Sequence, residues 1–168
     1  MIYKFKDKYP EFGINVFIAE SADVIGDVVI GNNSSVWFNS VIRGDVHSVR
    51  IGSNTNIQDG CILHVTGGLY NLEIGDNVTA GHNAVIHGCK IGNNVLIGMG
   101  SVILDRAVIN DNSLVAAGSV VREGFEIPEG VLAAGVPARI VRKLSEDEIR
   151  KIGESADGYS ELAKEYMK

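Results

Sequence analysis

Aliphatic residues recur along this chain with a period of six. The recurring positions form four runs, which are Ile18, Val24, Ile30, Val36 and Ile42; Ile51, Ile57 and Leu63; Ile74, Ala80 and Ile86; and Ile91, Ile97, Ile103, Ile109, Val115, Val121 and Ile127. An α-helix repeats its apolar face about every 3.6 residues and cannot produce this period. A coil of three short flat faces does, when each hexapeptide supplies one inward residue. The pattern therefore predicts an all-β parallel β-helix.

Polar residues mark the corners of this coil. The neighbours of each inward residue point outward, because side chains alternate along a strand. Glycine, asparagine and aspartate tolerate the positive φ angles that tight corners need. They gather at four predicted corners, Gly31-Asn32-Asn33, Gly52-Ser53-Asn54, Gly75-Asp76-Asn77 and Gly92-Asn93-Asn94.

The period slips in three places. The intervals are nine residues from Ile42 to Ile51, eleven from Leu63 to Ile74 and five from Ile86 to Ile91. The first predicts three extra residues that bulge out between residues 43 and 50. We interpret the second as six plus five, with Leu69 pointing inward. The slips flank three histidines, as expected where a site distorts a repeat.

The rhythm ends near Ile127, and a helix is expected to follow the coil. Ser145 and Glu148 have the spacing of a capping box. We expect a β-helix domain over residues 1–140 and a C-terminal helical segment over 141–168, packed on the coil as one structural unit.

The helical segment carries an apolar stripe at three- and four-residue spacing. Its members are Ile149, Ile152, Ala156, Tyr159, Ala163 and Tyr166. Gly153 and Gly158 weaken an isolated helix. Packing along the coil or onto a neighbour must therefore hold it.

Composition narrows the class of protein. The chain has 168 residues and a formal net charge of −6, with no large basic cluster, so nucleic acid is not an expected partner. No apolar run approaches the roughly 18 residues of a membrane span. Residues 1–10 are charged and do not resemble a secretory signal, so we expect a cytoplasmic protein. Cys61 and Cys89 are expected to be reduced thiols.

The three histidines between residues 64 and 87 are candidate metal ligands. Counting inward positions at 63, 69, 74 and 80 predicts that His64 and His82 stack one coil apart, with His87 on the next face. Three imidazoles plus water form a catalytic zinc site. Residues on two faces of a prism diverge, so one chain cannot easily close the tetrahedron. A partner subunit would supply the missing ligand, which predicts an oligomer with the metal at its interface.

Several short motifs carry a resemblance to a known family. They are Arg43-Gly44-Asp45, Asn56-Ile57-Gln58-Asp59, His64-Val65-Thr66, Gly81-His82 and His87-Gly88-Cys89. Together, over residues from about 10 to 167, they resemble the motifs of the γ-class carbonic anhydrases and their bacterial relatives. The hexapeptides themselves resemble the left-handed β-helix family, which implies the handedness of the coil.

This resemblance implies a homotrimer with metal ions at the subunit interfaces. His64 and His87 would come from one chain and His82 from the next, around Zn²⁺ or, alternatively, Fe²⁺ or Co²⁺. The substrate would be a small molecule, CO2 or bicarbonate, and no membrane or nucleic acid would take part.

Five further residues match functional positions of the family. Arg43 would pair with the interface carboxylates Asp45 and Asp59, because its planar fork suits carboxylates. Gln58 would hydrogen-bond the hydroxide on the metal. Tyr159 resembles a tyrosine of the C-terminal helix that reaches the metal site in short-loop relatives.

Two other residues near these motifs are expected to have no direct role. Asn56 is expected to be a turn residue in an asparagine ladder. His47 is expected to be a surface residue near the site.

The chain departs from the family pattern at the residues that transfer protons. Prototype members have a glutamate directly after the Arg-x-Asp motif, where this chain has Val46, and another in an acidic loop. Here residues 66–72 contain no acidic residue. Because both glutamates that transfer protons in the family are missing, we expect a low turnover.

Three readings of function remain open. The first is reversible hydration of CO2 to bicarbonate by hydroxide held on the metal. The second is a CoA-dependent acyltransferase, since Gly135-Val136-Pro137-Ala138 also occurs at the end of the coil in that superfamily. Such an enzyme would use one histidine as general base and no metal. The third is a metal-binding scaffold or a thioester hydrolase, because fold alone does not determine function.

Overall fold

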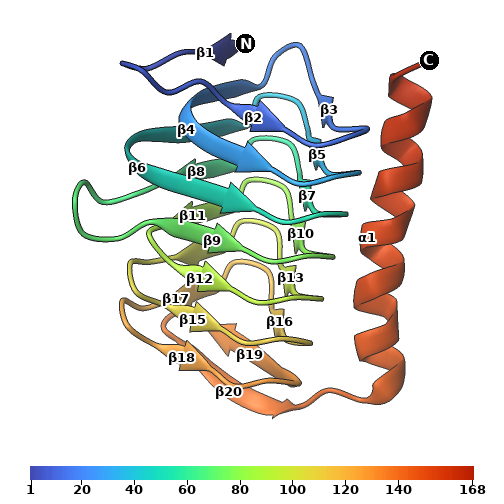
Figure 1. The fold of residues 1–168 in the computed structure, drawn as a ribbon. Coiled ribbons are helices and arrows are strands. Elements are labelled where there is room, and N and C mark those ends of the chain that lie inside the picture. The colour runs from blue at the N-terminus through green and yellow to red at the C-terminus, as the bar shows by residue number, and fades with distance from the viewer.

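The computed structural model describes residues 1–168 as a coil with three flat faces and one helix along its side (Figure 1). We name the faces by Figure 1: the near face, the rear face and the helix face. The near face holds β2 (Glu11–Phe12), the second half of β4 (Asp23–Ile30) and of β6 (Val41–Ile51), β9 (Leu72–Ile74), β12 (Lys90–Ile91), β15 (Val108–Ile109) and β18 (Glu126–Ile127). The rear face holds β1 (Ile2–Tyr3), the first half of β4 and of β6, β8 (Ile62–His64), β11 (Val85–His87), β14 (Val102–Ile103) and β17 (Val120–Val121). The helix face holds β3 (Phe17–Ile18), β5 (Ser35–Val36), β7 (Asn56–Ile57), β10 (Thr79–Ala80), β13 (Leu96–Ile97), β16 (Leu114–Val115), β19 (Val131–Gly135) and β20 (Ala138–Lys143).

The coil is left-handed, as the resemblance implied. In Figure 1 the near-face strands run from left to right, the helix-face strands lie at the right, and the chain returns along the rear while it descends. Within each face, a strand pairs in parallel with the strands of the neighbouring coils. The exception is the last pair, β19 and β20, which is antiparallel.

The hexapeptide residues form the core, as predicted. All of them are buried except Ile18, which is half-buried because β3 is an edge strand that pairs only with β5. The predicted bulge is also confirmed. Between Gly44 and Val49 the longer strand β6 passes four residues, while its partner β4 passes only Asp27.

The interpretation of Leu69 as an inward residue was wrong, since its side chain is 67% exposed. Leu72 is the inward residue instead, paired with Val49 on β6. The chain leaves the rear face after β8, makes a loop closed by a bridge between Thr66 and Tyr70, and re-enters on the near face. The eleven-residue interval is therefore one step between faces with an insertion, and not two steps.

Asparagines form a ladder at the corner between the near and helix faces. Six of them have positive φ, namely Asn15, Asn33, Asn54, Asn77, Asn94 and Asn112. Side-chain amides bond between coils, with Asn54 donating to Asn77 at 2.8 Å and Asn94 to Asn112 at 2.7 Å. This regular corner is what the glycine, asparagine and aspartate clusters predicted.

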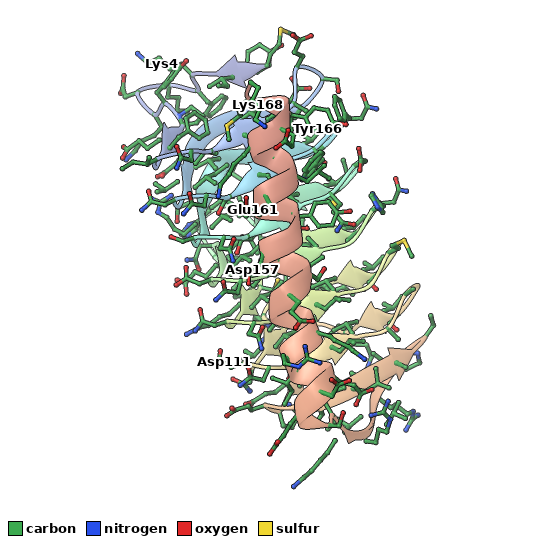
Figure 2. The ribbon with its side chains drawn as sticks, turned by 90° about the vertical axis from the view of Figure 1, so that its right-hand side faces the viewer. Lys4, Asp111, Asp157, Glu161, Tyr166 and Lys168 are labelled. Carbon is green, nitrogen blue, oxygen red and sulfur yellow. The ribbon has the colours of Figure 1, made fainter.

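Helix α1 (Glu146–Tyr166) lies along this corner and the helix face. Figure 2 shows it running the length of the coil, from near Asp111 to Tyr166 beside the first coils. It begins with the predicted capping box at Ser145 and Glu148. Ile152, Ala156 and Ala163 are its buried residues.

Polar contacts with the asparagine ladder help to fix the position of α1. Asn54 donates to Asp157 at 2.7 Å, and Asn94 donates to the carbonyl of Ile149 at 3.3 Å. Buried side chains and these bonds thus hold α1 against the coil, as expected for a helix that Gly153 and Gly158 weaken.

The outward residues of the rear and near faces differ in character. On the rear face the register aligns an apolar column, Val41, Ile62, Val85, Val102 and Val120. On the near face the corresponding column is Arg50, Glu73, Lys90, Val108 and Glu126. Of these two faces, the rear face is the one that presents a continuous apolar strip.

The cysteines and the helix agree with what the sequence predicts of them. Cys61 and Cys89 are both free and buried, and burial raises the pKa of Cys61 to about 12. The one helix, α1, is not long and apolar enough to cross a bilayer.

Candidate metal centre

His64 and His87 lie one directly above the other at the corner between the rear and near faces. The register of β8 and β11 pairs the two residues, and Nδ1 of His64 lies 3.1 Å from Nε2 of His87. The prediction that His64 stacks on His82 was therefore wrong. It followed from the misplaced Leu69, which put Ala80 on the rear face when it belongs to the helix face.

A carboxylate holds the remaining ring nitrogen of each of these histidines. Asp45 Oδ1 lies 3.0 Å from His64 Nε2, and Asp105 Oδ1 lies 2.6 Å from His87 Nδ1. An ionised carboxylate only accepts hydrogen bonds, so these two nitrogens carry protons. When both imidazoles are neutral, the nitrogens that face each other then present lone pairs, because a hydrogen bond at one ring nitrogen sets the role of the other.

This arrangement fits a metal ion. Two facing lone pairs repel each other unless a cation lies between them. Two nitrogens bound to one tetrahedral zinc at about 2.0–2.1 Å would be about 3.3 Å apart, close to the observed separation. Metal-bound histidines usually donate their other N–H to a carboxylate, as both do here. The donor chemistry of His64 and His87 therefore suits Zn²⁺, Fe²⁺ or Co²⁺.

The two carboxyl groups are held in their ionised form. Burial alone would raise the pKa of Asp45, but hydrogen bonds from His64 and Arg43 and the Arg43 charge hold this pKa below its ordinary value. Burial also opposes ionisation of Asp105, and hydrogen bonds from Thr66 and His87 lower its pKa in the same way. Both aspartates can therefore act as acceptors at neutral pH.

His82 lies at the opposite edge of the rear face, in the corner between β10 and β11. Its Nδ1 lies 2.8 Å from Asp59 Oδ2, and its side chain is 39% exposed. No group of three or more His, Cys, Asp or Glu side chains converges within one chain where a metal could bind. The chain thus carries a candidate two-histidine half-site and a candidate one-histidine half-site, separated by the rear face.

Gln58 is fixed beside His82. Its Oε1 accepts from the backbone N–H of His82 at 3.2 Å, and its Nε2 donates to Asn56 Oδ1 at 3.1 Å. Asn56 is buried in β7 and donates to Thr79 Oγ1 at 2.9 Å. The expectation that Asn56 is a turn residue in the ladder was therefore wrong, since it anchors Gln58.

Arg43 and Asp59 do not meet within one chain. Arg43 bonds to Asp45, and the Arg43 side chain is 43% exposed. Asp59 instead bonds to His82, and its side chain is 42% exposed. Of the predicted trio, a single chain brings only Arg43 and Asp45 together.

Tyr159 of α1 lies near the one-histidine half-site. Its ring packs edge-on against Trp37 with a centroid separation of 5.4 Å. Burial raises the pKa of Tyr159, and the charge of Asp59 raises it further. These contacts put the phenol within the electrostatic range of Asp59.

His47 is half-buried in the β6 bulge. Its Nδ1 accepts from the backbone N–H of Ser48 at 2.8 Å, so the ring bonds to its own loop.

Sequence reasoning missed Asp105 and Thr66. Thr66 Oγ1 donates to Asp105 Oδ2 at 2.7 Å, while Oδ1 faces His87. A signal for Asp105 was present, since it follows His87 by one coil of about 18 residues at the same corner.

Comparisons with known proteins agree with the fold and the motifs. The bacterial transferase hexapeptide family (six repeats) matches residues 71–104 and 88–123. A carbonic anhydrase of Geobacillus kaustophilus is 46% identical over 166 residues, which are 99% of this chain and 91% of that protein. A hexapeptide transferase family protein from Anaplasma phagocytophilum has a similar structure, with a TM-score of 0.93, 39% identity, and coverage of 99% of this chain and 98% of that one.

A plant relative carries the class name. Gamma carbonic anhydrase 1, mitochondrial, of Arabidopsis thaliana is 48% identical over 162 residues. The match covers 94% of this chain but only 59% of the plant protein, so this chain spans about three fifths of its length. The identity over nearly the whole chain, together with the arginine, glutamine and histidine motifs, shows that the chain belongs to the γ-carbonic anhydrase family.

Proposed function

We propose that this chain catalyses the reversible hydration of CO2 to bicarbonate at a metal site shared between copies of the chain. The observation that carries the proposal is the pair of facing imidazole nitrogens of His64 and His87, 3.1 Å apart, each ring oriented by its own aspartate. This is a donor pair for a cation, and His82 would complete it to three imidazoles.

The location of the half-sites supports a ring of three chains. They lie at opposite edges of the rear face, so one edge of each copy can meet the other edge of the next copy. Such a head-to-tail contact forms a closed ring when the rotation closes. The family resemblance implies three copies in that ring, and the apolar strip on the rear face provides surface to bury there.

The same contact would give Arg43 a second partner. Arg43 is half-exposed at the edge that carries His64 and His87, and Asp59 is half-exposed at the edge that carries His82. In a ring, the guanidinium of one copy faces the Asp59 carboxylate of the next, which suits the planar donor fork of arginine.

A metal ion held by the three histidines would supply Lewis acidity and lower the pKa of water toward 7. Hydration of CO2 forms one bond from a water oxygen to carbon, breaks one C=O π bond whose electrons go to the carbonyl oxygen, and breaks one O–H bond to release a proton. Gln58 would orient that oxygen, and the bonds that fix its amide to Asn56 and to the backbone of His82 support this role. Val46 and residues 66–72 offer no carboxyl group, so the released proton passes to solvent or buffer.

The proposal is tested by metal analysis and a CO2-hydration assay on the same anaerobically purified sample. We expect one metal ion per chain and hydration by at least one of the zinc, iron and cobalt forms. Replacement of any one of the three histidines by alanine should abolish stoichiometric metal. Full metal occupancy in His82→Ala, or no hydration above the buffer background in all three metal forms, would overturn the proposal.

A second candidate is acyl transfer, because a structural relative is named a hexapeptide transferase family protein. An acyltransferase would use one histidine as base and need no metal. Titration calorimetry with acetyl-CoA separates the two candidate functions, since a CO2-hydrating enzyme is not expected to bind acetyl-CoA saturably. The carboxylate-oriented histidine pair favours the first candidate.

A further inference from the structure

Asp105 connects a metal-ligand candidate to the loop over residues 66–70. One carboxylate oxygen accepts from His87 Nδ1 at 2.6 Å, and the other accepts from the hydroxyl of Thr66 at 2.7 Å. The Asp105 side chain is 22% exposed. Both of its oxygens thus have fixed partners, on β11 and on the loop.

The residues around Asp105 leave room for this arrangement. A methyl group at Gly88 would collide with Asp105 Oδ1, so the residue after His87 must lack a side chain for the carboxylate to reach the ring. Gly88 also has a φ of 48°, which glycine adopts without strain.

The loop itself is held at its base. Backbone bonds of 3.1 Å join Thr66 and Tyr70 in both directions, and the Arg106 guanidinium lies 5.6 Å from the centroid of the Tyr70 ring. Thr66 therefore presents its hydroxyl to Asp105 from a closed, packed turn and not from a free segment.

We propose that Asp105 is a positioning residue that fixes the tautomer and orientation of His87, and that Thr66 positions Asp105 in turn. The inference rests on the proposed metal site. It assigns a role there to Asp105, which lies outside the family motifs, and to Thr66, which lies in a motif but had no role assigned. With Asp105 accepting at Nδ1, the proton stays away from Nε2, which is the nitrogen that faces His64. Without the carboxylate, the proton can move to Nε2 and block it as a ligand.

The test uses the full chain with three substitutions and a control. Asp105→Asn keeps the size of the side chain and removes its charge. Thr66→Val removes the hydroxyl, and Thr66→Ser restores it. Asp111→Asn is the matched control, because Asp111 accepts a backbone N–H from Asn93 at a coil corner and Asn93 itself fills the same role one coil earlier.

Two measurements are made on each variant. The zinc dissociation constant is measured by competition with a chromophoric chelator, and the ring-nitrogen shifts of His87 are measured by 15N NMR on metal-free protein in mildly alkaline buffer. We expect Asp105→Asn to weaken zinc binding about 10- to 100-fold and to shift His87 toward the tautomer that is protonated at Nε2. Thr66→Val should weaken zinc binding less than Asp105→Asn does, and Thr66→Ser should match the parent chain. Asp111→Asn should change neither the zinc affinity nor the His87 tautomer.

The inference is overturned if Asp105→Asn leaves both the zinc affinity and the His87 tautomer unchanged, or if Asp111→Asn weakens zinc as strongly. The NMR result separates this inference from the proposed function. A parent chain that binds none of zinc, iron and cobalt refutes the proposed function, whereas the tautomer of His87 in metal-free protein still reports whether Asp105 fixes the ring.

Discussion

Each of the three histidines has an aspartate on one ring nitrogen. The pairs are His64 with Asp45, His82 with Asp59 and His87 with Asp105. In a neutral imidazole, the proton stays on the nitrogen that faces the carboxylate, so the other ring nitrogen is available as a ligand. The histidines alone were visible in the sequence as candidates. Their partners could not all be predicted, because the aspartate that reaches a ring depends on the corner geometry of neighbouring coils.

At this scale Gln58→Ala tests the role of the glutamine. The change removes the amide but leaves all three histidines, so metal content should stay at the parent level. CO2 hydration should fall about 10²-fold at every buffer concentration, since a positioned polar group of this kind is typically worth that much. Stopped-flow assays of metal-matched samples measure it, and an unchanged rate would remove Gln58 from the mechanism.

The missing glutamates give a separate prediction for the unmodified chain. With no carboxyl group at Val46 or in residues 66–72, proton release should limit turnover. Turnover should therefore rise steeply with the concentration of an imidazole-type buffer, which accepts the proton in their place. A rate that is already maximal at low buffer would show that another group of the chain carries the proton.

At the scale of elements, the six-residue period was sufficient to predict the coil, its core and the bulge in β6. It failed at the loop after β8, because an exposed leucine, Leu69, falls at the expected inward position, six residues after Leu63. A periodicity cannot distinguish an insertion within one step from two short steps. That single error moved His82 onto the wrong face. The helix α1 was predictable because capping and an apolar stripe are local signals.

Two glycines in α1 provide a matched pair of substitutions. A methyl group at Gly158 meets nothing within 4 Å, whereas at Gly153 it would approach Asn94 Oδ1 to 3.2 Å. Gly158→Ala should therefore stabilise the protein by about 0.5–1 kcal/mol. Gly153→Ala should gain less, because it presses on the asparagine ladder. Thermal unfolding of both variants tests the packing of α1, and an equal gain in both would contradict the observed close approach.

At the scale of the whole molecule, the apolar strip on the rear face separates the two half-sites. Val102→Asp would place a carboxylate in that strip, and burying an unpaired charge at an interface is strongly unfavourable. We expect this variant to be monomeric by light scattering and to lose its metal. Val108→Asp is the control, because Val108 is equally half-buried but lies on the near face beside Lys90. Equal assembly of both variants would exclude the rear face as the interface.

The most direct test of the shared site is to mix two inactive variants. His82→Ala retains the two-histidine half-site, and His64→Ala retains His82. Each alone should bind no stoichiometric metal. Co-refolded in equal amounts, they should regain metal and CO2-hydration activity in about a quarter of the sites, since a head-to-tail ring pairs the two intact halves at random in that proportion. If mixed oligomers form and no metal or activity returns, the claim that neighbouring chains share the metal site is contradicted.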